Sequence, residues 1–67
     1  MYVHNGQQLR QILETREIRP AEFARRIQKS RQWLHAVMQT AMWREATLDT
    51  IAVALKVPYA RFFKLHK

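Results

Sequence analysis

The sequence predicts an all-α fold, a compact five-helix bundle. Apolar residues recur at spacings of three and four along the chain, which is the pattern of amphipathic helices. The chain contains one glycine and two prolines, and each proline stands where a helix can begin. A chain of 67 residues has room for one domain with a small core, so we expect residues 1–67 to form a single domain.

The first helix is predicted to begin at Asn5 and to fade near Arg16. Asn5 can cap the helix with its side chain, and Gln8 stands at the position that completes a capping box. The residues before it, 1–4, are expected to form a loose or strand-like arm. Ile18, in the connection that follows, is expected to be buried. The buried stripe of this helix is predicted to consist of Leu9, Ile12 and Leu13.

Two further helices, joined by a tight turn, are predicted between Pro20 and Gln39. Pro20 suits the first position of a helix, since its missing N–H would lack a partner there in any case, and Glu22 adds favourable negative charge. Ser30 is placed to accept backbone N–H bonds at the start of the second of these helices. Their buried faces are predicted to hold Phe23, Ala24 and Ile27, and Leu34, Val37 and Met38, respectively.

The fourth and fifth helices are predicted to follow a loop at residues 41–46. The start of the fourth is open between Thr47 as a cap and a first turn at residues 44–46. The fifth is predicted to begin at Pro58 and to place Tyr59, Phe62 and Phe63 on one side. The predicted core of the bundle is Leu9, Ile12, Leu13, Ile18, Phe23, Ala24, Ile27, Leu34, Val37, Leu48, Ile51, Ala52, Leu55 and Phe62.

The outer face of the helix after Ser30 follows from a rotation of about 100° per residue. Long hydrogen-bonding side chains beside a small alanine suit a helix in the DNA major groove, where Arg reads guanine and Gln reads adenine. The alternative is a solvated polar helix face. The residues that point away from Leu34 are Gln32, Ala36 and Gln39, with Arg31 and His35 on one flank and Trp33 and Thr40 on the other.

The charge of the chain points to a polyanionic partner. Twelve Lys and Arg residues against five Asp and Glu give a formal net charge of +7. A basic segment without acidic residues is typical of nucleic-acid-binding surfaces. The alternatives are a generally basic protein and, less favoured because no wide exposed apolar helix face is predicted, a membrane surface. Residues 23–44 contain no acidic residue and five basic ones, Arg25, Arg26, Lys29, Arg31 and Arg44.

The sequence does not indicate an enzyme or a metal site. There is no cysteine, the three histidines have no closely spaced ligand partner, and there is no glycine-rich phosphate loop. Ser30 and His35 lie about 140° apart on one helix, so they cannot pair as nucleophile and base. We expect no catalytic residue, metal, cofactor or small-molecule substrate. The N-terminus has no long apolar run, so we expect no signal peptide, no membrane span and a cytoplasmic location.

These elements resemble the Cro and phage-repressor class of helix-turn-helix proteins, the Xre-like family with a lambda-repressor-like DNA-binding domain. The matching pieces are Leu9-Arg10, Glu22-Phe23-Ala24, Ser30 with Leu34 and Val37, and Thr47-Leu48 followed by residues 51–57. The resemblance implies that Arg31, Gln32 and Ala36 read bases, with Trp33 as a fourth. The residues expected at DNA phosphates are Arg25, Arg26, Lys29, Ser30, His35, Gln39 and Arg44.

The chain departs from the family pattern at four positions. Gln28 stands where a turn glycine is usual, and a left-handed backbone there would cost a non-glycine residue about 1 kcal/mol. Lys29 replaces an apolar residue, and Met38 replaces an acidic one. Pro20 replaces a glutamine that contacts phosphate, so one expected donor is missing.

Two functions are left open by the sequence. The first is a sequence-specific transcriptional regulator, a repressor, bound to double-stranded DNA as a homodimer because one helix reads only a few base pairs. The second is a protein-interaction module of the same fold, such as an antitoxin-like subunit. The chain has more apolar residues near its C-terminal end than a small core easily uses, namely Met42, Trp43, Phe62, Phe63 and Leu65. Some are expected to form a partner surface, with Trp43, Phe63 and Leu65 as the candidate dimer patch, and closure of the base of the bundle is an equal alternative.

Overall fold

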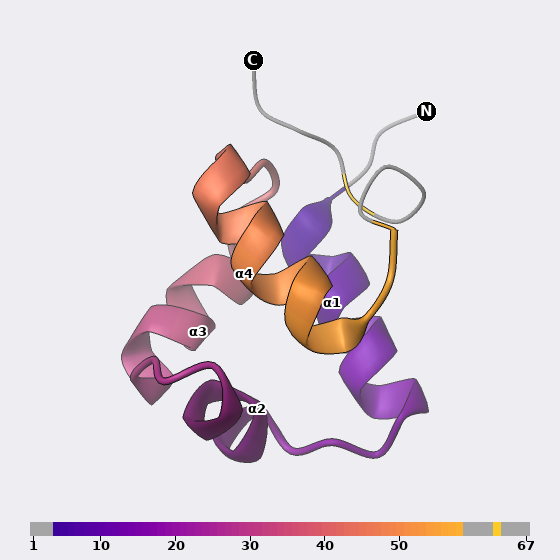
Figure 1. Cartoon of the computed structure of the whole chain (residues 1–67), viewed down its shortest axis with the longest axis vertical. Coiled ribbons are helices and arrows are strands. Elements are labelled where there is room, and N and C mark those ends of the chain that lie inside the picture. The colour runs from indigo at the N-terminus through magenta and orange to yellow at the C-terminus, as the bar shows by residue number, and fades with distance from the viewer. Residues whose placement is uncertain (1–3, 59–62, 64–67) are drawn as a thin grey trace.

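The computed structural model describes residues 4–58 and 63 of the chain. Within this part there are four helices and no strand: α1 (Asn5–Thr15), α2 (Pro20–Arg26), α3 (Arg31–Met38) and α4 (Glu45–Leu55) (Figure 1). The predicted all-α class is confirmed, but the structure shows four helices where five were predicted. The expected fifth helix falls mostly on residues 59–62, outside the described part, and neither Pro58 nor Phe63 is helical.

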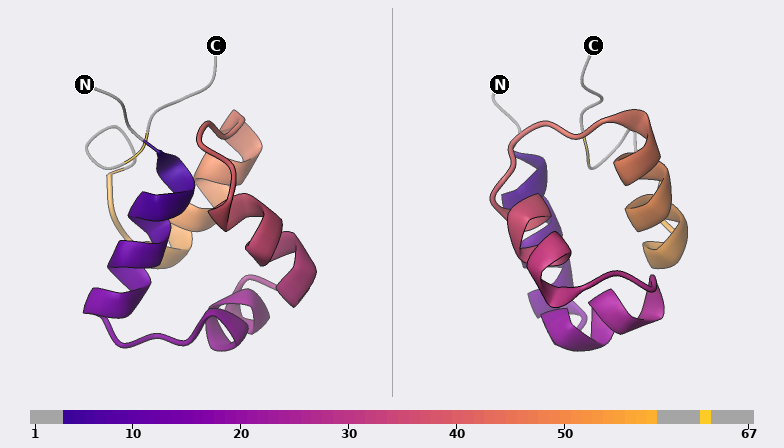
Figure 2. Two further views of the ribbon diagram at one scale, coloured as in Figure 1. Left: turned by 180° about the vertical axis from the view of Figure 1, so that it is seen from behind. Right: turned by 90° about the vertical axis from the view of Figure 1, so that its left-hand side faces the viewer.

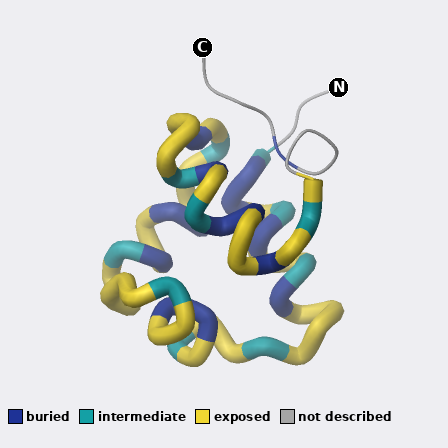
Figure 3. The backbone as a smooth tube through the Cα atoms, in the orientation of Figure 1, coloured by how far each residue is buried: buried dark blue, intermediate teal, exposed yellow. Residues whose placement is uncertain are grey.

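The four helices enclose one core (Figure 3). α3 packs against both α1 and α2. α1 and α3 lie closest where α1 starts and α3 ends, and they spread apart toward the end of the molecule that α2 occupies (Figure 2). α4 lies across one side of this pair. Each helix turns one apolar stripe inward, as its spacing predicts. The core consists of Leu9, Leu13, Phe23, Ala24, Leu34, Val37, Met38, Trp43, Leu48, Ile51, Leu55 and Phe63.

The predicted core is largely confirmed, with differences at its edge. Ala52 is buried as expected, whereas the three isoleucines at 12, 18 and 27 are only partly buried against the core. Phe62 lies outside the described residues. Met38, which the spacing placed on the inner face of α3, is 7% exposed. Helical periodicity therefore identifies the inner faces correctly but does not tell how deep each residue lies.

The start of α1 is held against the end of α3 through backbone atoms. The first N–H groups of a helix have no partner within it. Here the N–H groups of Asn5 and Gly6 donate to the carbonyls of Ala41 and Thr40, at 2.7 and 3.1 Å. Gly6 also lies directly against the backbone of Met38, where an added Cβ atom would overlap the carbonyl oxygen. The single glycine of the chain is thus required for this close approach.

This contact corrects the predicted cap of α1. His4, not Asn5, is the N-cap residue, and its Nδ1 accepts the N–H of Gln7 at 3.0 Å. Asn5 is the first helical residue and is fully buried, so it does not hold the N-cap position that the predicted capping box with Gln8 requires. At α4 the first turn at residues 44–46 is the correct alternative, because the helix begins at Glu45 after an extended Arg44 rather than at a Thr47 cap.

Three of the four helices end in the same way, and none of them uses glycine. Glu17, Gln28 and Lys56 adopt left-handed backbone angles, with φ of 57°, 58° and 58°. In each case the next N–H reaches back across the last turn, as in a Schellman motif. Gln28, which stands where the family usually has a turn glycine, therefore does adopt the left-handed conformation. In these three bonds a backbone N–H donates to a backbone carbonyl: Ile18 to Leu13 at 2.9 Å, Lys29 to Ala24 at 2.9 Å and Val57 to Ala52 at 3.1 Å.

The predicted dimer patch is wrong at two of its three residues. Trp43 and Phe63 are 2% and 4% exposed, and their rings stack with centroids 4.9 Å apart. The indole N–H of Trp43 donates to the carbonyl of Val37 at 3.0 Å. These aromatic residues close the base of the core, which is the alternative that the sequence left open. Leu65 lies outside the described residues.

Replacing Gly6 with alanine is expected to destabilise the fold by about 3 kcal/mol, because the new methyl group must displace the backbone of α3. An ordinary glycine-to-alanine change within a helix would instead stabilise the fold by about 1 kcal/mol. The sign of the change in the free energy of unfolding therefore distinguishes a close backbone approach from an ordinary helical glycine. The measurement is denaturant unfolding followed by circular dichroism, with Gln11→Ala on the exposed side of α1 as the control. A Gly6→Ala protein as stable as the parent would contradict the close approach.

Replacing Gln28 with glycine is expected to stabilise the fold by up to about 1 kcal/mol, because glycine adopts the left-handed backbone without strain. The matched control is Gln32→Gly, an exposed position inside α3, where glycine should instead cost about 1 kcal/mol. Thermal unfolding of the two variants beside the parent chain measures both effects. Equal losses at the two positions would show that residue 28 is not left-handed in solution.

Candidate nucleic-acid interface

The first feature of the site is the outer side of α3. Ser30 caps the helix, since its Oγ accepts the N–H of Trp33 at 3.0 Å. Leu34, Val37 and Met38 face the core, which fixes the rotation of the helix. This confirms the predicted division of α3 into an inner and an outer side. The outer residues Arg31, Gln32, His35, Ala36 and Gln39 are all exposed.

The outer side of α3 forms one wall of an open groove with a volume of about 1150 Å³. α1 supplies the facing wall, and the start of α2 closes one end. Six of the predicted site residues are brought together here. They are Ser30, Arg31, Gln32, His35, Ala36 and Gln39, and the groove adds Arg10, Leu13, Glu14, Ile18, Arg19, Pro20, Ala21, Leu34 and Met38.

Short side-chain bonds stiffen the second half of this surface. The Nε2 atoms of His35 and Gln39 are 3.1 Å apart in a hydrogen bond along one turn of α3. Beyond the helix, the hydroxyl of Thr40 donates to the carbonyl of Ala36 at 2.8 Å. Ala36 therefore lies on a well-ordered turn with no side chain covering it. The first turn differs, because no bond from the side chains of Arg31 or Gln32 restrains them among the described residues.

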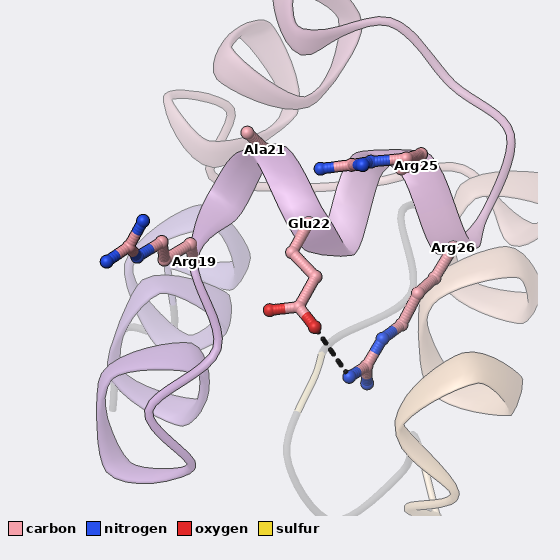
Figure 4. Close-up of a pocket in the computed structure, with 5 residues that line it drawn as sticks. All are labelled: Arg19, Ala21, Glu22, Arg25 and Arg26. Atoms are coloured by element: carbon pink, nitrogen blue, oxygen red, sulfur yellow. Dashed lines mark hydrogen bonds and ion pairs between the residues drawn. The ribbon is translucent and has the colours of Figure 1, made fainter.

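A second depression lies along α2 and is lined by Arg19, Ala21, Glu22, Arg25 and Arg26 (Figure 4). Arg25 and Arg26 leave the helix on different sides. Arg26 is paired with Glu22, its NH2 group 3.1 Å from a carboxylate oxygen. Both side chains are about half exposed, so the pair contributes little to stability. It nevertheless neutralises the charge of Arg26, which makes Arg26 the weakest of these three phosphate candidates.

Lys29, Trp33 and Arg44 line neither depression. Lys29 is exposed and holds its ammonium group 5.1 Å from the ring centre of Trp33, which is a cation–π contact. Trp33 is half-buried against the core, so only part of its ring is available to a base. Arg44 is exposed directly before α4. The structure therefore separates these three residues from the groove.

Sequence reasoning missed two arginines at this surface. Arg10 of α1 lines the groove opposite α3, and Arg19 lines both the groove and the α2 depression. Both are exposed. They were overlooked because they precede the basic segment at residues 23–44. The spacing of Arg10 one residue after the buried Leu9 does place it on the flank of α1, which is a usable signal once α1 and α3 are known to be neighbours.

Other kinds of site find no support in residues 4–58 and 63. No three His, Asp or Glu side chains there come together in a way that could hold a metal ion. None of the described helices has both the length and the apolar character needed to cross a membrane. Comparisons with models of protein families, with curated proteins and with solved structures found no match.

Replacing Ser30 with alanine is expected to destabilise the fold by about 1 kcal/mol, because the N–H of Trp33 loses its acceptor. Ser30→Asp should retain most of the stability, since a carboxylate also caps a helix start. Thermal unfolding of both variants is the measurement. If Ser30→Asp lowers the unfolding temperature as much as Ser30→Ala does, the hydroxyl of Ser30 does not stabilise the fold by capping α3.

Proposed function

We propose that this chain is a sequence-specific DNA-binding transcriptional regulator in which α2 and α3 form a helix-turn-helix unit and α3 enters the major groove. The observation that carries the proposal is the outer side of α3. It is exposed, carries long hydrogen-bonding side chains at Arg31, Gln32 and Gln39, and has the small Ala36 between them. The helix is fixed to the core from behind, so its outer residues are presented by a rigid support.

Arg31 and Gln32 are proposed to be the main base-reading residues. They lie in the first turn of α3, the part of such a helix that approaches base edges most closely. An arginine can bind guanine through two hydrogen bonds, and a glutamine can bind adenine in the same way. Ala36, one turn later, permits close approach and can contact a thymine methyl group. Trp33 is a weaker candidate because it is half-buried.

The basic residues around α3 are proposed to bind phosphates. Arg25 and Lys29 lie on the exposed surface of α2 and of the turn, and Arg44 lies before α4. His35 and Gln39, tied together on α3, can donate to a phosphate beside the groove. Ser30 keeps its hydroxyl proton for the same purpose while its oxygen caps the helix. Arg26 contributes less, because Glu22 neutralises it.

The regulator is proposed to be a repressor that binds as a homodimer. One helix of two turns reads only a few base pairs, and a second copy on an adjacent half-site raises specificity. Such a dimer needs a surface other than the predicted aromatic patch, because Trp43 and Phe63 are buried. The proposed place of action is the cytoplasm, where DNA would be within reach.

Replacing Arg31 or Gln32 with alanine is expected to cost roughly 1–3 kcal/mol of binding on the preferred DNA site and to relax base preference at one position. The preferred site comes from selection in a randomised duplex pool. Titration of each variant against preferred and scrambled duplexes measures the ratio of the two affinities. If this ratio is unchanged in both variants, α3 does not read bases and the proposed function is wrong.

The matched controls are Arg25→Ala and Lys29→Ala. Both remove a charge beside α3 but no proposed base contact, so they should weaken preferred and scrambled duplexes alike. Each should also flatten the dependence of log affinity on log salt by about one unit. Arg26→Ala should have a smaller effect on that slope than Arg25→Ala, because the pair with Glu22 already neutralises Arg26.

A further inference from the structure

The groove between α1 and α3 has a floor that DNA binding does not explain. Its accessible apolar surface is formed by Ile18, Pro20 and Ala21, since Leu13, Leu34 and Met38 are already buried in the core. Phosphates are bound by charge and by hydrogen bonds, so an apolar floor adds little to their affinity. An apolar floor inside a groove is instead typical of a site that buries apolar side chains of a partner.

The rim of the same groove is basic on three sides. Arg10 comes from α1, Arg19 precedes α2, and Arg31 begins α3. Guanidinium groups stay charged at any physiological pH, and the described residues show no ion pair for these three. Glu14 is the only carboxylate among the groove residues. Three fixed positive charges against one negative charge favour an acidic occupant.

The size of the groove favours a protein segment over a small molecule. Its volume of about 1150 Å³ is larger than a typical ligand pocket of roughly 300–1,000 Å³. It is also an open groove, in which a small molecule would keep much of its surface in water. An amphipathic helix lying along a groove buries one apolar stripe and leaves its polar sides at the rim, which matches this surface.

We propose that the α1–α3 groove docks an acidic amphipathic helix of a partner protein. The apolar stripe of that helix covers Ile18, Pro20 and Ala21. Its carboxylates pair with the guanidinium groups of Arg10, Arg19 and Arg31. Arg31, Gln32 and Ala36 line the same groove and are the proposed base-reading residues. A docked helix therefore excludes DNA, and this last step rests on the proposed function.

The probe is a fluorescein-labelled synthetic peptide of about 16 residues, with Leu at helical i, i+3 and i+4 positions and Glu at most others. Its binding to the full chain is followed by fluorescence anisotropy. Two control peptides separate the contributions: one has Ser for every Leu and keeps the charge, and the other has Gln for every Glu and keeps the apolar stripe. We expect each control to bind at least about tenfold more weakly.

The variants Arg10→Ala and Arg19→Ala are expected to weaken the peptide about threefold to tenfold each. The matched control is Lys56→Gly, which removes a positive charge directly after α4, at a residue that does not line the groove. Glycine also suits the left-handed backbone at this position. Circular dichroism checks that all three variants remain folded. If Lys56→Gly weakens peptide binding as much as Arg10→Ala and Arg19→Ala do, the affinity comes from general charge attraction and the proposal is overturned. The proposal is also overturned if the Ser-for-Leu peptide binds as tightly as the Leu–Glu peptide.

Competition with DNA separates this inference from the proposed function. Release of a labelled preferred duplex by the Leu–Glu peptide, but not by the Ser-for-Leu peptide, supports both. Peptide binding that depends on Arg10 and Arg19 in a chain that binds no duplex supports the docking groove and removes the DNA proposal. Duplex binding with intact base preference but no peptide binding overturns the docking groove and leaves the DNA proposal standing.

Discussion

The close approach of Gly6 to the backbone of Met38 is the constraint on which the rest of the structure depends. It brings the start of α1 against the end of α3 without intervening side chains. The two backbone bonds from Asn5 and Gly6 then fix the axial position of α1. Because α1 and α3 are the two walls of the groove, this contact sets the spacing between Arg10 on one wall and the outer side of α3 on the other. A separate bond connects α4 to the end of α1, where the guanidinium Nη1 of Arg16 donates to the carbonyl of Leu55 at 2.7 Å.

Using its one glycine in a helix leaves the chain with none for its turns. Three helix ends therefore place non-glycine residues, Glu17, Gln28 and Lys56, in the left-handed conformation that glycine adopts more easily. This conformation costs each of them about 1 kcal/mol of folding free energy. The ends of α1 and α4 offset part of this cost with apolar residues, Ile18 and Val57, directly after the left-handed residue. The end of α2 has Lys29 at the equivalent position. Its ammonium group lies over Trp33 of the next helix, so a cation–π contact stands where the other two ends use apolar packing.

The sequence predicted the features that depend on local periodicity. The inner stripes of all four helices, the cap at Ser30 and the exposure of Arg31 and Gln32 follow from spacing alone. It failed where a residue is governed by a distant segment. Asn5 is not a cap because the chain after α3 occupies its N–H, and Trp43 is not a surface residue because the carbonyl of Val37 accepts its indole N–H. The groove was not predicted for the same reason, since its two walls meet only in the folded chain.

Overlap between the proposed reading surface and the proposed docking groove has a thermodynamic consequence. Arg31, Gln32 and Ala36 line the groove as well as the outer side of α3, so one occupant excludes the other directly. Mass action then sets the effect: a competitor at a hundred times its own dissociation constant lowers the apparent DNA affinity about a hundredfold, or about 2.7 kcal/mol. No second conformation is required. Regulation by occlusion therefore suits a small rigid bundle in which α3 is held to the core along its whole inner side, because such a helix has little freedom to move in response to a remote ligand.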